Sequence, residues 1–158
     1  MVSCMISIHK HLHTADDTTN LALALAPLLD AGDTLLLEGP IGAGKTHFAR
    51  SLIQALLPTP EDVPSPTFTL VQTYDANGLE IWHADLYRLT HPDEVFELGL
   101  DDALETAICL IEWPDRLGSE LPADALMLSF APTHSEARDL TITGANPKWD
   151  KLTGALGG

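Results

Sequence analysis

The chain has 158 residues, of which 45% are hydrophobic and 20% charged, a composition that favours one folded domain and argues against wholesale disorder. Eight Lys and Arg against 23 Asp and Glu give a net charge of −15, which disfavours direct binding to the phosphodiester backbone of a nucleic acid. No apolar run reaches the roughly 18 residues of a membrane span and no secretory signal precedes the first strand, so we expect a cytoplasmic protein with no membrane partner.

The first half of the chain alternates between strand and helix patterns. Residues 5–12 predict a short strand, and residues 17–29 predict a helix. Residues 34–38, TLLLE, are a continuous apolar run closed by an acid, the pattern of a strand buried on both faces of a parallel sheet. A helix is predicted from about residue 46 to residue 57, where Pro58 stops it.

The middle of the chain combines a hairpin with further helices. Two β-rich runs flank DANG at residues 75–78, whose Asn-Gly pair is a strong hairpin signal. Residues 92–105 predict two short helices broken near Gly99. AICLIE, residues 107–112, predicts a second fully buried strand, which Trp113-Pro114 ends.

The last elements complete a mixed α/β fold. Residues 125–131 and 137–144 suggest an antiparallel strand pair, and residues 145–158 suggest a weakly ordered tail that forms a weak helix, frayed at its last glycines. No linker divides the chain. We therefore predict one domain over residues 1–158, with a mixed, mostly parallel central sheet, flanking helices and antiparallel hairpin additions.

The stretch GPIGAGKT, residues 39–46, fits the spacing G-x-x-x-x-G-K-[ST] between a predicted strand and a predicted helix. Its glycines allow successive backbone N–H groups to point at phosphate oxygens, and the helix start adds its positive dipole end. Lys45 is expected to reach the β- and γ-phosphates, and Thr46 to bind Mg²⁺ through its hydroxyl. The pattern predicts a P-loop NTPase-like domain.

Acidic residues at two predicted strand ends are candidates for catalysis. Glu112 closes AICLIE, and parallel strands deliver their ends to the crevice beside such a loop; the simpler alternative is a solvated strand end. Asp85, in HADLYR, is a candidate to hold Mg²⁺ through water or to orient the attacking water. Arg88 either pairs with phosphate or bridges to an acid. Tyr87 and Trp82 are expected to pack.

Two further stretches carry hydroxyl or imidazole groups. Ser65-Pro66-Thr67 ends the proline-rich passage PTPEDVPSPT, residues 58–67. This loop is expected either to become ordered when nucleotide binds or to be a rigid connector. His9, His11 and His13 alternate along one strand face, a pattern that fits an edge strand better than a metal site.

Four motifs in this order give the chain a family resemblance: GPIGAGKT, SPTFTLV, HADLYRL followed by PDEVFELGL, and IEWPDRL. On these motifs the chain resembles the TsaE family, bacterial P-loop ATPases required for the threonylcarbamoyladenosine modification of tRNA. The resemblance spans nearly the whole chain. It implies a domain that binds ATP and Mg²⁺ and that hydrolyses ATP slowly by itself. The domain is expected to be a monomer when alone and to act with the TsaB and TsaD proteins. Because TsaD would hold the tRNA, no direct contact of this chain with tRNA is expected.

The same resemblance carries roles over to individual residues. It implies that Thr46, Glu112 and Asp85 hold the metal, that Lys45, Asp85 and Glu112 act in catalysis, and that the segment from Ser65 to Phe68 is a switch-like loop. The nucleotide-binding set that we predict from the motif and the family together is Gly39, Ile41, Gly42, Ala43, Gly44, Lys45, Thr46, His47, Ser65, Thr67 and Trp113.

Three positions depart from the family pattern. Pro40 stands where an acidic residue is common, and His47 where a second threonine is frequent, although the His47 backbone N–H is still expected to face phosphate. His134-Ser135 stands where the family often has a Gly-Arg pair near the adenine, so no arginine is expected to contact the adenine from that position. Arg138 is a candidate substitute.

Two other functions remain open on the sequence. A small-molecule kinase needs an acceptor pocket and usually an arginine-rich lid, whereas this chain has four scattered arginines. A nucleotide-gated binding module would work through its bound state without turnover. A GTPase is disfavoured because no Asn-Lys-x-Asp motif is present.

Overall fold

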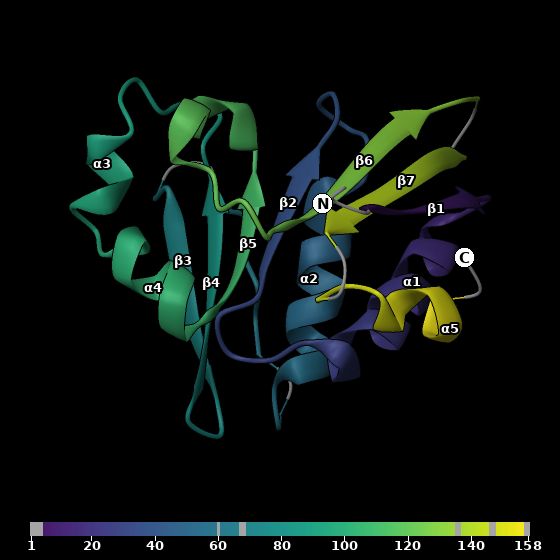
Figure 1. The fold of residues 1–158 in the computed structure, drawn as a ribbon, viewed down its shortest axis with the longest axis horizontal. Helices are drawn as coiled ribbons and strands as arrows, with labels where there is room; N and C mark the ends of the chain where they lie inside the picture. Colours follow the sequence, from purple (N-terminus) through teal and green to yellow (C-terminus); the bar gives the residue numbers. More distant parts are fainter. Residues whose placement is uncertain (1–4, 60, 67–68, 135–136, 146–147, 157–158) are drawn as a thin grey trace, which may run out of the picture.

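The computed structural model describes residues 5–59, 61–66, 69–134, 137–145 and 148–156. The elements follow one another as β1 (Met5–Leu12), α1 (Ala15–Leu25), η1 (Ala26–Leu28), β2 (Thr34–Glu38), α2 (Lys45–Leu56), β3 (Val71–Ala76), β4 (Leu79–Asp85), α3 (Asp93–Phe96), α4 (Leu100–Thr106), β5 (Ile108–Glu112), η2 (Pro114–Glu120), β6 (Leu126–Pro132), β7 (Arg138–Ala145) and α5 (Lys151–Leu156). Figure 1 shows this arrangement.

All seven strands belong to one sheet in the order β1-β7-β6-β2-β5-β4-β3. The four central strands, β6, β2, β5 and β4, run parallel, whereas β3 pairs antiparallel with β4, and β7 pairs antiparallel with both β6 and β1. The predicted mixed, mostly parallel sheet with hairpin additions is therefore confirmed. The carboxyl ends of the central strands meet at one edge of the sheet, the upper edge in Figure 1.

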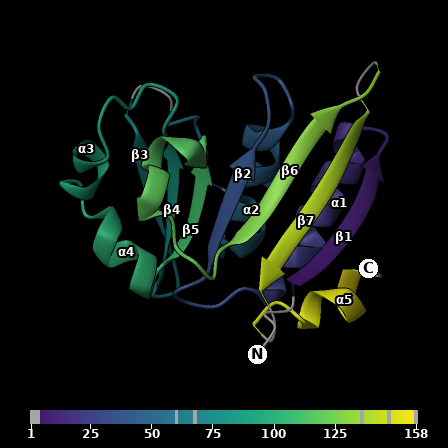
Figure 2. The same cartoon turned by 45° about the horizontal axis from the view of Figure 1, so that its top comes forward.

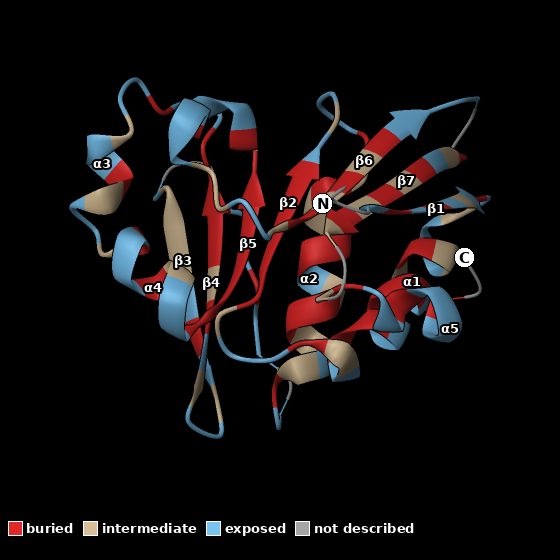
Figure 3. Ribbon diagram, viewed as in Figure 1, coloured by how far each residue is buried: buried red, intermediate tan, exposed pale blue. Residues whose placement is uncertain are grey.

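Helices cover both faces of the sheet, and each face has its own apolar core. Alternate residues of β2 and β5 divide between the two cores, with Leu35 and Leu110 in the core under α1 and α2, and Leu36 and Ile111 in the core under α3 and α4. Figure 2 shows α1 and α2 on one side of the sheet. β2 and β5 are buried along nearly their full length in Figure 3, as their continuous apolar runs predict, whereas β6 alternates between buried and partly exposed residues.

The predicted helix over residues 17–29 differs from the observed one at both ends. The α-helix begins at Ala15, because the Thr14 side chain accepts a hydrogen bond from the Asp17 N–H and caps it. It ends at Leu25 and continues as the 3₁₀ turn η1, which contains Pro27. Proline has no N–H to donate to the preceding turn, so the α-helical pattern stops there.

The segment after β7 packs back onto the domain through one tryptophan. Trp149 is fully buried, and its indole N–H donates to the Asp124 carbonyl at 2.7 Å. A Cβ at Gly144 would lie 2.8 Å from the Trp149 ring, so the absent side chain makes room for the indole. Across the described ranges, none of the helices has the length and apolar character needed to span a bilayer.

Candidate functional site

The glycine-rich loop, residues 39–46, joins the end of β2 to the start of α2. Gly39, Gly42 and Gly44 have φ angles of +146°, +82° and +101°, which side-chain-bearing residues rarely adopt. A Cβ at Gly39 would lie 2.6 Å from the Phe130 carbonyl oxygen of β6, so there glycine is also required for space. The loop conformation thus depends on the glycines that identified it in the sequence.

Lys45 begins α2 and is held inside the loop. Its side chain is only 4% exposed, its Nζ donates to the Gly39 carbonyl at 2.6 Å, and Nζ lies 3.5 Å from the centroid of the Trp113 ring. Burial lowers the pKa of the Lys45 ammonium, and the carboxylates of Glu112 and Asp85 oppose that shift. The lysine is thus a partly desolvated cation beside the loop.

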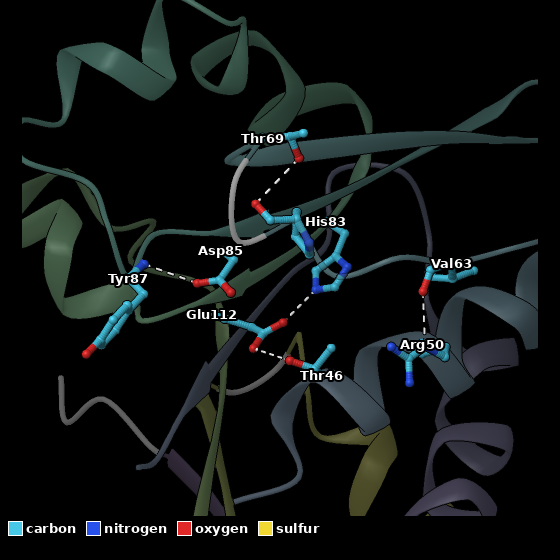
Figure 4. Close-up of polar contacts among 9 residues, drawn as sticks. Thr46, Arg50, Val63, Thr69, His83, Asp85, Tyr87 and Glu112 are labelled. Atoms are coloured by element: carbon cyan, nitrogen blue, oxygen red, sulfur yellow. Dashed lines mark hydrogen bonds and ion pairs between the residues drawn. The ribbon is translucent and has the colours of Figure 1, made fainter. Parts of the chain in front are cut away.

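The neighbouring strands β4 and β5 end together, because Asp85 pairs in register with Glu112. Both carboxylates are buried, at 5% and 2% exposure. Glu112 accepts a hydrogen bond from the Thr46 hydroxyl at Oε1, 2.8 Å away, and its Oε2 lies 2.7 Å from His83 Nε2 (Figure 4). Glu112 is therefore not a solvated strand end, the simpler alternative that the sequence left open.

Asp85 is oriented by the chain that follows it. Its Oδ1 accepts a hydrogen bond from the Tyr87 N–H at 3.1 Å, and its own N–H donates to the Leu70 carbonyl at 2.9 Å. Figure 4 shows the Asp85 side chain beside Glu112 at the end of the sheet. Two carboxylates of different strands therefore meet at the start of α2.

A cavity of about 440 Å³ lies over these groups. It is lined by Ile41, Gly42, Gly44, Lys45, Thr46, His47, Asp85, Tyr87, Arg88, Glu112 and Trp113. Nine of these residues were predicted site residues. The predicted Gly39 and Ala43 support the loop without lining the cavity, Ser65 is exposed and does not line it, and Thr67 is outside the described residues.

Trp113 closes one side of the cavity in an unusual backbone conformation. Its φ and ψ are 58° and 54°, in the left-handed region that residues with side chains seldom occupy. Its ring packs against that of Tyr87, with 5.0 Å between centroids. Tyr87 was predicted only to pack, but it is 42% exposed and lines the cavity, so it belongs to the site as well.

Arg138, at the start of β7, contacts the glycine-rich loop. Its Nε donates to the Ala43 carbonyl and its Nη2 to the Gly42 carbonyl, both at 2.9 Å. The sequence suggested Arg138 as an adenine contact, whereas its guanidinium here binds the loop backbone. Members of the family often carry an arginine in the loop before the last strand, which is why the sequence drew attention to Arg138. The position of its side chain depends on the antiparallel pairing of β7 with β6, which the structure shows.

His47 and the amino-terminal histidines contact other parts of the fold. The His47 Nε2 lies 2.9 Å from the Thr19 hydroxyl, which ties α2 to α1. His9 and His11 lie on β1, an edge strand as predicted, and His11 Nδ1 pairs with Asp139 at 2.6 Å. Within the part of the chain that the structure describes, His, Cys, Asp and Glu side chains form no group of three able to hold a metal.

The amino-acid sequence is similar to those of known proteins. Residues 12–140 match the family model described as "Threonylcarbamoyl adenosine biosynthesis protein TsaE". The chain belongs to the TsaE family. TsaE of Rickettsia bellii is 36% identical over 88% of this chain and 96% of its own length, and TsaE of Bacillus subtilis is 33% identical over 87% and 85%.

A solved structure extends the likeness to the fold. The crystal structure of YdiB from Bacillus subtilis superposes with a TM-score of 0.78, at 26% identity, over 99% of this chain and 97% of that chain. The family predicted from four short motifs is therefore confirmed over most of the chain. Family membership places the chain among the proteins of tRNA threonylcarbamoyladenosine biosynthesis.

Proposed function

We propose that this TsaE protein is an ATPase that binds ATP with Mg²⁺ and supports the threonylcarbamoyladenosine modification of tRNA together with TsaB and TsaD. The observation that carries the proposal is the meeting of Lys45, Thr46, Glu112 and Asp85 around one cavity at the glycine-rich loop. An ammonium, a hydroxyl and two carboxylates are the groups that phosphoryl-transfer sites of this loop type use.

The charges of the site favour a divalent cation. The buried carboxylates of Asp85 and Glu112 face one buried ammonium, that of Lys45. A triphosphate entering beside two buried negative charges would be repelled unless a cation accompanied it. Thr46 and Glu112 would hold Mg²⁺ directly, Asp85 would join them through water, and the ion would neutralise charge on the phosphates.

The other side chains of the site would bind the phosphates, orient the attacking water and exclude bulk water. Lys45 would exchange its contact with the Gly39 carbonyl for phosphate oxygens, and the loop N–H groups would complete the cradle. Asp85, held by the Tyr87 N–H, would orient the attacking water and accept its proton. Trp113 and Tyr87 would exclude bulk water from one side of the cavity.

The charge of the chain supports a role without direct contact to tRNA. A net charge of −15 opposes binding to a polyanion, so the tRNA would be held by TsaD and this chain would act on the TsaB–TsaD pair. The family resemblance implies slow hydrolysis by the protein alone, and docking on TsaB–TsaD would accelerate it. The segment Ser65 to Phe68 stays our candidate for the loop that responds to ATP.

Calorimetry with ATP and Mg²⁺, followed by hydrolysis assays with and without purified TsaB–TsaD, tests the proposal. We expect magnesium-dependent ATP binding, and hydrolysis that TsaB–TsaD accelerates. Asp85→Asn should keep the ATP affinity and lower turnover on the order of 100-fold or more. No magnesium-dependent binding by the well-folded wild-type protein would overturn the proposal.

The same variant separates the proposal from its alternatives. If Asp85→Asn supports full tRNA modification in the reconstituted system, the bound state alone carries the function, as in a nucleotide-gated module. If phosphate from ATP appears on a small molecule instead of in solution, the protein is a kinase. Loss of modification together with loss of phosphate release supports coupled hydrolysis.

A further inference from the structure

His83 is a buried imidazole to which the proposed hydrolysis assigns no role. It lies on β4, two residues before Asp85, so both side chains project from the same face of the sheet. The residue is fully buried, in the part of the sheet that faces α2. Burial of an imidazole is unfavourable unless its ring nitrogens find partners, so the position calls for a physical reason.

The contact of His83 is with the candidate metal ligand itself. Its Nε2 lies 2.7 Å from Glu112 Oε2, while the other oxygen of the same carboxylate, Oε1, accepts the Thr46 hydroxyl at 2.8 Å. The two oxygens of Glu112 are thus held from opposite directions, one by β4 and one by α2 (Figure 4). This pair of contacts fixes the plane of the carboxylate.

The second ring nitrogen indicates that His83 is not there for stability alone. Among the described residues, His83 Nδ1 is buried with no hydrogen-bond partner. An apolar side chain of similar volume would fill the same space without leaving a buried polar atom unpaired. The gain that offsets this cost is the hydrogen bond to Glu112.

We propose that His83 is a positioning residue that orients Glu112 for Mg²⁺. By donating from Nε2 to Oε2, it holds Oε1 beside Thr46, so that the carboxylate and the hydroxyl face the same cation. The inference rests on the proposed nucleotide function, and it gives a role to His83, the first residue of the HADLYRL motif, to which the family resemblance assigned none. Hydrogen bonds behind metal ligands fix ligand orientation, and their loss typically costs 10- to 100-fold in metal affinity.

The test compares two variants of nearly equal length. His83→Gln keeps an N–H donor near the position of Nε2, and His83→Met removes it. ATP affinity is measured by calorimetry in millimolar Mg²⁺ and in EDTA. We expect His83→Met to lower the affinity in Mg²⁺ by about 10- to 100-fold, to leave the affinity in EDTA within about twofold, and His83→Gln to stay close to wild type in both.

Thr34→Val is the matched control. Thr34 is also buried with an unpaired polar atom, its Oγ1, but on β2 away from the cavity, so its substitution should change stability without changing the magnesium dependence. Equal affinity of wild type and His83→Met in Mg²⁺, or an equal loss in Mg²⁺ and in EDTA, overturns the inference. Failure of the wild type itself to bind ATP with Mg²⁺ overturns the proposed function instead.

A measurement on the wild-type protein covers the case in which His83→Met does not fold. In ¹⁵N-histidine spectra of the ATP complex, with His83 assigned from the His83→Gln variant, addition of Mg²⁺ should shift the His83 Nε2 resonance while that of His91, an exposed histidine, stays in place. An unchanged His83 resonance contradicts the inference, because a ligand that binds the cation must alter the group bonded to it.

Discussion

Gly39→Ala tests whether steric contact with β6 holds the glycine-rich loop, residues 39–46, in its conformation. The added Cβ would lie 2.6 Å from the Phe130 carbonyl oxygen, closer than non-bonded carbon and oxygen atoms approach. The backbone of β6 supplies that oxygen and cannot rotate away as a side chain would. The φ of +146° is also one that alanine rarely adopts.

These two terms set the expected loss of stability. An unfavourable backbone conformation costs about 1–3 kcal/mol, and forcing an extra carbon into a packed site costs about 1–3 kcal/mol. Gly39→Ala should therefore lower the free energy of unfolding by about 2–6 kcal/mol, a large part of the roughly 5–15 kcal/mol of an ordinary domain. The shifted loop should also bind ATP less tightly.

Gly42→Ala is the control within the same loop. Its φ is +82°, but no atom lies within 4 Å of the added Cβ, so only the backbone term of about 1–2 kcal/mol applies. Urea unfolding followed by circular dichroism gives both values. If Gly39→Ala is no less stable than Gly42→Ala, the contact with Phe130 does not limit the loop and the reasoning is wrong.

Three further outcomes follow from the structure. Arg138→Lys keeps the positive charge but removes the planar guanidinium that bridges the Gly42 and Ala43 carbonyls, so calorimetry should show ATP binding several-fold weaker. Arg116→Lys, at an exposed arginine, is the control and should bind ATP as wild type does. Burial raises the pKa of the Cys109 thiol to about 12, so mass spectrometry should find that peptide unalkylated at mildly alkaline pH until urea is added. Burial lowers the pKa of Lys45 below its usual 10.5, so the unfolded chain binds that proton more tightly than the folded chain does. In urea titrations, wild type should therefore gain stability relative to Lys45→Met as the pH rises toward 10.5. A stability difference between the two proteins that does not change with pH would contradict this.

Much of the fold could be predicted because its strongest signals are local. TLLLE and AICLIE are continuous apolar runs closed by an acid, the pattern of strands that are buried on both faces of a parallel sheet. Asn77-Gly78 forms the turn between β3 and β4, and Gly99, at φ +103°, separates the two short helices. In each case neighbouring residues alone determine the conformation.

Contacts between distant segments could not be predicted in the same way. The sequence indicates that Asp85 and Glu112 each end a strand, but their adjacency depends on β5 lying between β2 and β4. Burial of Trp149 depends on the space that Gly144 leaves by having no side chain. The Trp149 ring fills that space only when the segment after β7 folds back onto the domain. The short helix η2 after Trp113 was missed because its sequence, PDRLGSE, has no apolar period.

The antiparallel additions to the sheet are part of the site for a topological reason. Parallel strands place their carboxyl ends at the edge of the sheet where the glycine-rich loop lies, and an antiparallel strand places its amino end at that same edge. Arg138 is the first residue of β7 and pairs with Pro132, the last residue of β6, so its side chain begins beside the loop. A change in the length of the β6–β7 connection would move Arg138 away from the Gly42 and Ala43 carbonyls. Such a change should therefore weaken ATP binding even where the sheet stays fully folded.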